Sequence, residues 1–78
     1  MTDINCILTM ISDHLKYIRS ADRLMAQKLV FKANDAINMA EKIRVALKAT
    51  THPIALDHLV RTRNRYYNCV IAVQKGLV

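Results

Sequence analysis

The chain has 78 residues, enough for one small domain covering residues 1–78. Hydrophobic residues make up 53% of it and charged residues 23%, a composition that excludes a charge-expanded disordered chain. One glycine, one proline and no Asn-Gly pair are too few turn residues for a multi-stranded sheet, so the composition predicts an all-α protein.

Charge and targeting signals bear on the compartment and on the partner. Lys and Arg number 12 against six Asp and Glu, and of the formal net charge of +6, residues 1–40 carry +1 and residues 41–78 carry +5. A basic half favours anionic partners, although an ordinary solvated surface has the same composition. No basic signal-peptide segment and no apolar stretch long enough to span a bilayer is found, which predicts a cytoplasmic protein with no membrane partner.

Residues 3–19 form the first predicted helix, because apolar residues recur there at three- and four-residue spacing. Thr2 or Asp3 is suited to cap its start. A second helix is predicted over residues 22–49, where alanines on the apolar stripe allow another helix to approach closely. The stripes consist of Ile4, Ile7, Leu8, Ile11, Leu15 and Ile18 in the first helix, and of Met25, Leu29, Ala33, Ala36, Ala40, Ile43 and Leu47 in the second.

The boundary between these two helices is open to two interpretations, because their stripes have nearly the same phase and only Asp22 interrupts the seam. The first is a break near residues 20–22, where Ser20 and Asp22 are capable N-caps. The second is one helix of about 45 residues, about 68 Å long at roughly 1.5 Å per residue, which must oligomerise to be covered. The break is favoured, since a monomer of this size cannot cover so long a helix.

The third predicted helix runs over residues 53–75. Pro53 suits its first turn, Thr51 or His52 its cap position, and Gly76 its stop. The short link before it requires the second and third helices to be antiparallel. The chain is therefore predicted to be a small three-helix bundle built on that hairpin, and to be oligomeric because a single core of this size is marginal.

The first two helices each carry a second apolar stripe that a three-helix bundle does not need for its core. Scattered exposed apolar residues are normal in soluble proteins, but two matching stripes predict a surface for self-association or for capture of a partner helix. These stripes consist of Cys6, Met10 and Tyr17 in the first helix, and of Leu24, Phe31 and Val45 in the second.

The segment from Arg61 to Tyr67 combines three arginines with two tyrosines, a composition typical of a nucleic-acid surface. On a helix, Arg61 and Arg65 fall on one polar face, and the simpler interpretation is a solvated face with an Asp57–Arg61 ion pair. The predicted anion site consists of Lys42, Lys48, His52, Arg61 and Arg65.

Arg63 falls instead on the predicted apolar stripe of the third helix. A guanidinium keeps its charge, so burying it unpaired is costly. We predict that Arg63 pairs with Asp22 or with an acid of a partner chain; the alternative is that its stem lies along the stripe and its head reaches water. The stripe consists of Leu56, Leu59, Arg63, Tyr66, Tyr67 and Val70.

No pattern for catalysis, cofactor binding or metal binding stands out. The chain has no Gly-rich phosphate loop, and none of its three histidines has a His, Cys or Glu four residues away. Cys6 and Cys69 form no CxxC motif, and the cationic neighbours Arg65 and Lys75, which favour a low pKa of the Cys69 thiol, are not joined by an oriented base. We therefore predict reduced thiols, no enzyme activity and no cofactor.

These features favour a non-enzymatic helical interaction protein that self-associates and binds or modulates a partner protein, as an adaptor, regulator or phage-type inhibitor does. The alternative is a small nucleic-acid-binding protein that uses the face of Arg61 and Arg65. A third hypothesis, with the least support, is an anionic small-ligand binder at an oligomer seam, using Arg63 with Tyr66 or Tyr67. The partner interface is predicted at Cys6, Met10, Tyr17, Leu24, Phe31, Val45 and Arg63.

Overall fold

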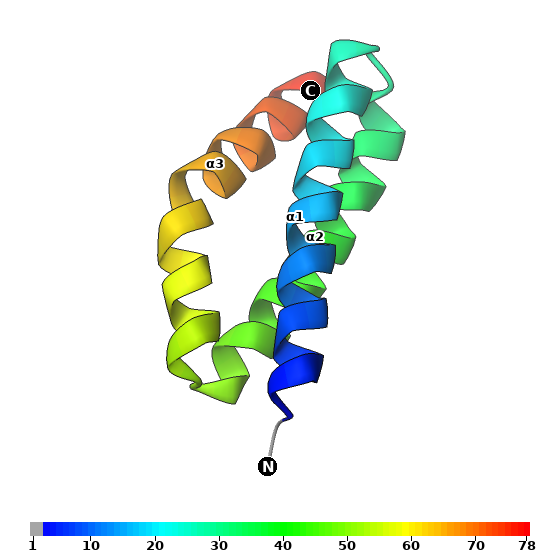
Figure 1. Ribbon diagram of the computed structural model, residues 1–78. Coiled ribbons are helices and arrows are strands. Elements are labelled where there is room, and N and C mark those ends of the chain that lie inside the picture. Colours follow the sequence, from blue (N-terminus) through cyan, green and yellow to red (C-terminus); the bar gives the residue numbers. More distant parts are fainter. Residues whose placement is uncertain (1–2) are drawn as a thin grey trace.

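The computed structural model describes residues 3–78 and contains three helices, α1 (Ile4–Ala26), α2 (Val30–Thr50) and α3 (Pro53–Leu77). No strand occurs among these residues, which confirms the all-α prediction. α1 and α2 lie side by side, and α3 leaves the far end of α2 and returns toward the α1–α2 turn (Figure 1). The molecule measures 41 × 18 × 15 Å. Within the described part, no helix is both long and apolar enough to cross a membrane.

The first helix is longer than predicted. It begins after Asp3, whose carboxylate accepts a hydrogen bond from the backbone N–H of Asn5; Thr2, the other predicted cap, lies outside the described residues. It continues to Ala26, so the favoured break between the first two helices is confirmed, but it lies after Ala26 and not near residues 20–22, and the single long helix was wrong. Asp22 does not interrupt the buried stripe because its side chain is half-exposed, at 49%, and reaches Arg65 on α3.

The turn between α1 and α2 is made by a lysine in a conformation that favours glycine. Lys28 has a φ of 60°. Its N–H donates to the carbonyl of Met25, and the N–H of Leu29 donates to the carbonyl of Leu24, both at 2.9 Å. These two bonds form a Schellman motif, the usual end of a helix at a left-handed residue. No glycine or proline marks this position, so the sequence pattern did not locate it.

The turn between α2 and α3 has the predicted position. Thr51 ends α2 with a φ of 53°, and His52 caps α3 by accepting a hydrogen bond at Nδ1 from the N–H of Ile54. Gly76, the predicted stop, lies inside the last turn of α3. A Cβ atom at Gly76 would lie 3.0 Å from Cγ1 of Val30, so the missing side chain allows the end of α3 to pack against the start of α2.

The core lies along the seam of the three helices. The predicted alanines Ala33, Ala36 and Ala40 are buried, and they bring α2 close to α1. The buried residues form three clusters, which are Ala21, Ala33, Ala36, Ile37, Cys69 and Val73; Ile18, Ala40 and Tyr66; and Ile7, Leu47 and Ala55.

The buried face of α3 is rotated from its predicted position. Tyr66 is buried as predicted, and Leu59 and Val70 are half-buried against the core clusters. Leu56 and Tyr67, however, are 38% and 48% exposed, and Arg63 is exposed. The face that packs on the core consists of Ala55, His58, Tyr66, Cys69 and Val73. His58 occupies an inward position on this face, where it forms a hydrogen bond with a second buried histidine, His14.

Candidate functional site

Two buried histidines join α1 to α3. Nδ1 of His14 and Nε2 of His58 lie 2.9 Å apart, and the rings meet edge to face. Burial, with the charges of His58 and Arg44, lowers the pKa of His14 to about 4, and burial also lowers the pKa of His58. Both rings are therefore neutral at pH 7, and one proton lies between them.

A second polar cluster joins α2 to α3. Arg44 donates two hydrogen bonds to the carboxylate of Glu41, at 2.8 and 2.7 Å, and the Tyr66 hydroxyl donates to the same carboxylate. The Arg44 hydrogen bond is the main cause that lowers the pKa of Glu41 to about 2. Burial and the Glu41 carboxylate raise the pKa of Tyr66 above its ordinary value. Glu41 is thus charged and Tyr66 neutral over the physiological range.

The two clusters form one polar layer across the molecule. The Tyr66 ring lies 5.9 Å from the His14 ring, and the Arg44 guanidinium lies 5.9 Å from the Tyr66 ring. The side chains of α1, α2 and α3 therefore meet at Tyr66. We call this set of His14, Glu41, Arg44, His58 and Tyr66 the polar layer.

Two clefts border the polar layer, and Arg44, Tyr66 and Tyr67 line both. The cleft of about 320 Å³ has one acid and one base, Glu41 and Arg44, and three amide side chains. The other cleft has a volume of about 330 Å³. We call it the cationic cleft, because three basic residues and no acidic residue of the described part of the chain line it. Its lining consists of His14, Arg44, Lys48, Leu56, Leu59, Val60, Thr62, Arg63, Tyr66 and Tyr67.

An apolar stripe runs along the outer side of α3. Leu56, Val60, Tyr67 and Ile71 recur at spacings of four and seven and are 38%, 73%, 48% and 48% exposed. These residues share one helical face, which we call the α3 stripe. It lies beside the cationic cleft, because Leu56, Val60 and Tyr67 line that cleft as well.

The residues of the predicted interface are divided between surface and core. Cys6, Phe31 and Val45 are exposed, Phe31 most of all at 79%. Three others, Met10, Tyr17 and Leu24, are half-buried and pack against the core clusters. Neither predicted stripe is therefore a continuous exposed surface.

Arg63 does not pair with Asp22, so that part of the prediction was wrong, and pairing with an acid of a partner chain stays a prediction. Its guanidinium lies over the Tyr67 ring, 5.9 Å from the centroid. Arg65 forms the ion pair with Asp22 instead, with 3.5 Å between its Nη2 and Oδ2 of Asp22. The rotation of α3 is the cause, because it places Arg63 on the outer face and turns Arg65 toward α1.

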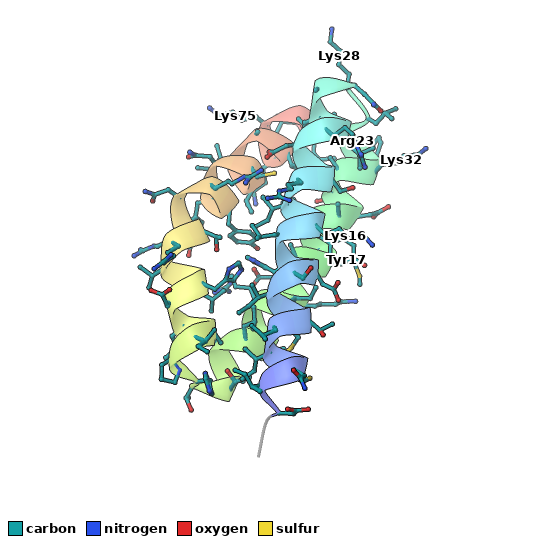
Figure 2. All side chains as sticks on the ribbon, viewed as in Figure 1. Lys16, Tyr17, Arg23, Lys28, Lys32 and Lys75 are labelled. Carbon is teal, nitrogen blue, oxygen red and sulfur yellow. The ribbon has the colours of Figure 1, made fainter. Side chains whose placement is uncertain are left out.

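The predicted anion site is not assembled as one surface. Arg61 forms the predicted pair with Asp57, at 2.9 Å, and Arg65 has its own carboxylate. His52 caps α3, Lys42 is exposed on α2, and Lys48 lines the cationic cleft. Figure 2 shows four further basic side chains at the opposite end of the molecule, where the α1–α2 turn lies: Arg23, Lys28, Lys32 and Lys75.

The polar layer was missed from the sequence, although parts of it leave a signal. His14 stands seven residues from both Ile7 and Ala21, so it continues a buried face. Glu41 and Arg44 have the three-residue spacing of a helical ion pair. The His14–His58 contact spans 44 positions and leaves no local signal.

The described residues contain no group of three His, Cys, Asp or Glu side chains arranged to hold a metal ion. The surface features that the geometry provides are an exposed apolar stripe and a cleft with positive charge. Comparisons of the chain with protein-family models, with curated proteins and with solved structures find no match.

Proposed function

We propose that the protein is a non-enzymatic helical interaction protein that forms a dimer through the α3 stripe and binds a partner protein. The observation that carries this proposal is the exposure of four large apolar side chains on one face of α3, in addition to the face that packs on the core. Aligned apolar side chains on a helix surface are the usual means by which helices associate.

The α3 stripe fits a second copy of itself. Leu56 and Ile71 are placed symmetrically about the point between Arg63 and Asn64, and so are Val60 and Tyr67. In an antiparallel pair of α3 helices related by a two-fold axis, each leucine thus meets an isoleucine and each valine meets a tyrosine. A two-fold interface requires such self-complementarity.

Two side chains remain for the partner protein. Phe31 and Val45 are 79% and 53% exposed on α2, and they do not belong to the α3 stripe. They are the most exposed large apolar residues of that helix. In this proposal the dimer presents them to the partner protein, and Phe31→Asp abolishes partner binding without changing the mass of the dimer.

The dimer is tested by comparing Ile71→Glu with Leu8→Glu. The two side chains are matched at 48% and 49% exposure, but Leu8 lies on α1, outside the stripe. We expect sedimentation velocity at micromolar concentrations to give a dimer for the wild type and for Leu8→Glu. Ile71→Glu is expected to raise the dissociation constant at least tenfold, about 1.4 kcal/mol, with unchanged helicity. A monomeric wild type at about 100 µM, or equal effects of both changes, contradicts the proposal.

Two observations argue against nucleic acid as the first choice. Arg61 and Arg65 each have a carboxylate within ion-pair distance. Four other basic side chains, Arg23, Lys28, Lys32 and Lys75, lie near the α1–α2 turn, away from the predicted anion site (Figure 2). Binding to an oligonucleotide at low salt that is lost in both Arg61→Ala and Arg65→Ala would reverse this order.

A further inference from the structure

We infer that the cationic cleft binds a small amphipathic carboxylate, an organic anion with an aliphatic body of the medium-chain fatty-acid type. This inference is made for the single chain, because Leu56, Val60 and Tyr67 belong both to the cleft and to the α3 stripe. The ligand and a second copy of the chain therefore compete for this surface. The inference goes beyond the proposed function by assigning a small-molecule ligand.

The charge of the cleft selects an anion. Lys48 and Arg63 line it from α2 and α3, and neither forms an ion pair with a carboxylate of the described residues. Arg44, the third basic residue, is held by Glu41, which lines only the neighbouring cleft. The positive charge of Lys48 and Arg63 is therefore available to a ligand, and an organic cation is disfavoured in the same place.

The remaining lining suits an aliphatic body. Leu56, Leu59 and Val60 supply the apolar side chains, and the Tyr66 and Tyr67 rings line the cleft beside Arg44 and Arg63. The cleft volume of about 330 Å³ falls within the range of small-molecule sites, at its lower end. A chain of a few methylene groups buries its apolar surface against these side chains. Inorganic phosphate has no apolar surface to bury there.

A buried nitrogen supplies the second, independent observation. Nε2 of His14 is inaccessible to solvent and has no hydrogen-bond partner within residues 3–78, although His14 lines the cleft. Its other nitrogen is occupied by His58. Leaving a buried polar atom unpaired is costly, and such an atom calls for a partner.

A carboxylate satisfies this nitrogen through a defined arrangement of protons. With the proton of His58 on Nε2, that N–H donates to Nδ1 of His14, and His14 carries its own proton on Nε2. Because Nε2 is covered in the unliganded structure, the side chains over it move aside when the ligand binds, and the Nε2–H then donates to a carboxylate oxygen while Lys48 and Arg63 balance the charge. The neighbouring cleft has no such atom and carries an acidic residue, so the inference applies to the cationic cleft alone.

The test is a titration with octanoate, followed by ¹H–¹⁵N spectra of the backbone and of the histidine rings. Octylammonium is the control ligand, because it has the same body and the opposite charge. Arg63→Met and Lys48→Met each remove one charge from the cleft. Arg61→Met is the matched control, since it removes an exposed arginine of α3 that does not line the cleft.

We expect saturable shifts at Leu59, Val60 and Tyr67, at least tenfold preference for octanoate over octylammonium, and an Nε2–H signal of His14 in the bound state. Arg63→Met and Lys48→Met are expected to weaken octanoate binding about fivefold each, and Arg61→Met to leave it unchanged. Equal binding of the two ligands, or equal affinity in all three variants, overturns the inference.

The same titration in the Ile71→Glu variant separates this inference from the dimer. Ile71 lies on the α3 stripe and does not line the cleft, so octanoate is expected to bind this variant at least as tightly as it binds a dimeric wild type. A failure of the dimer proposal appears in the sedimentation mass. A failure of the ligand inference appears as no saturable octanoate binding to the monomeric Ile71→Glu variant.

Discussion

Nδ1 of His14 and Nε2 of His58 lie 2.9 Å apart in the interior and connect the first helix to the last. Because burial lowers the pKa of both rings, folding keeps them neutral, whereas the unfolded chain takes up protons near its ordinary histidine pKa. For such a base, protonation favours the unfolded state. The pair therefore makes stability depend on pH on the acid side of neutrality.

The first prediction concerns this pH dependence. Stability is expected to be full above the unfolded pKa of 6.5 and to fall between that pH and about 4, the pKa of His14 in the fold. The loss is on the order of 3 kcal/mol for His14 alone, at about 1.4 kcal/mol per pKa unit. Protonation of Glu41 lowers stability further, but only as the pH falls from the ordinary pKa of 4.5 toward its pKa of about 2 in the fold. Urea unfolding at pH 7.5, 5.5 and about 4 measures the effect. A flat profile between pH 7.5 and 5 contradicts it.

A double-mutant cycle of the two histidines provides the second prediction. His14→Leu or His58→Leu alone removes one partner and leaves the other ring nitrogen buried, which is expected to cost about 1–3 kcal/mol. The double change removes both polar groups, so its cost is expected to be well below the sum of the single ones. Both single variants are also expected to lose part of the acid sensitivity. Additive costs would show that the hydrogen bond does not couple the two rings.

Local patterns predicted the helices but not how α3 is rotated. The alanine stripe of α2 and the Pro53 start of α3 follow from spacing and backbone chemistry, and both are confirmed. The end of α1 was misplaced because Lys28 takes a left-handed conformation without a glycine to mark it. Leu56 and Tyr67 of the α3 stripe were predicted on the core face, because that face is more apolar than the one that contains His58. The face that contains His58 is buried because its polar groups find partners on other helices, which local sequence does not show.

The third prediction separates two adjacent tyrosines. Tyr66 is buried and donates a hydrogen bond to Glu41, whereas Tyr67 is half-exposed and makes no side-chain hydrogen bond among the described residues. Tyr66→Phe is expected to lower the free energy of unfolding by about 1–2 kcal/mol, and Tyr67→Phe to change it by less than about 0.5 kcal/mol. Chemical denaturation of the two variants gives both values. Equal losses would indicate that the Glu41 bond contributes nothing.

The fourth prediction concerns the two thiols. Cys6 is exposed, whereas Cys69 is buried. Burial and the Asp22 carboxylate raise the pKa of Cys69 to about 12, contrary to the effect that its cationic neighbours suggest in the sequence. A thiol reagent at pH 8 is expected to modify Cys6 rapidly and Cys69 only as the protein unfolds. Cys6→Ser removes the fast phase. A fast phase that persists in this variant contradicts the buried position of Cys69.

The last prediction uses the left-handed turn between α1 and α2. Lys28 has a φ of 60°, a conformation that costs a residue with a Cβ atom about 1–2 kcal/mol and costs glycine little. The greater freedom of glycine in the unfolded chain offsets part of this gain. Lys28→Gly is therefore expected to raise the free energy of unfolding by up to about 1 kcal/mol.

Lys32→Gly is the matched control, because it removes the same exposed side chain four residues later inside α2. There glycine is expected to lower stability by about 1 kcal/mol. Thermal unfolding followed by circular dichroism measures both changes, and opposite signs are the required result. If Lys28→Gly lowers the melting temperature as Lys32→Gly does, then α1 and α2 are continuous through this position and the Schellman turn is wrong.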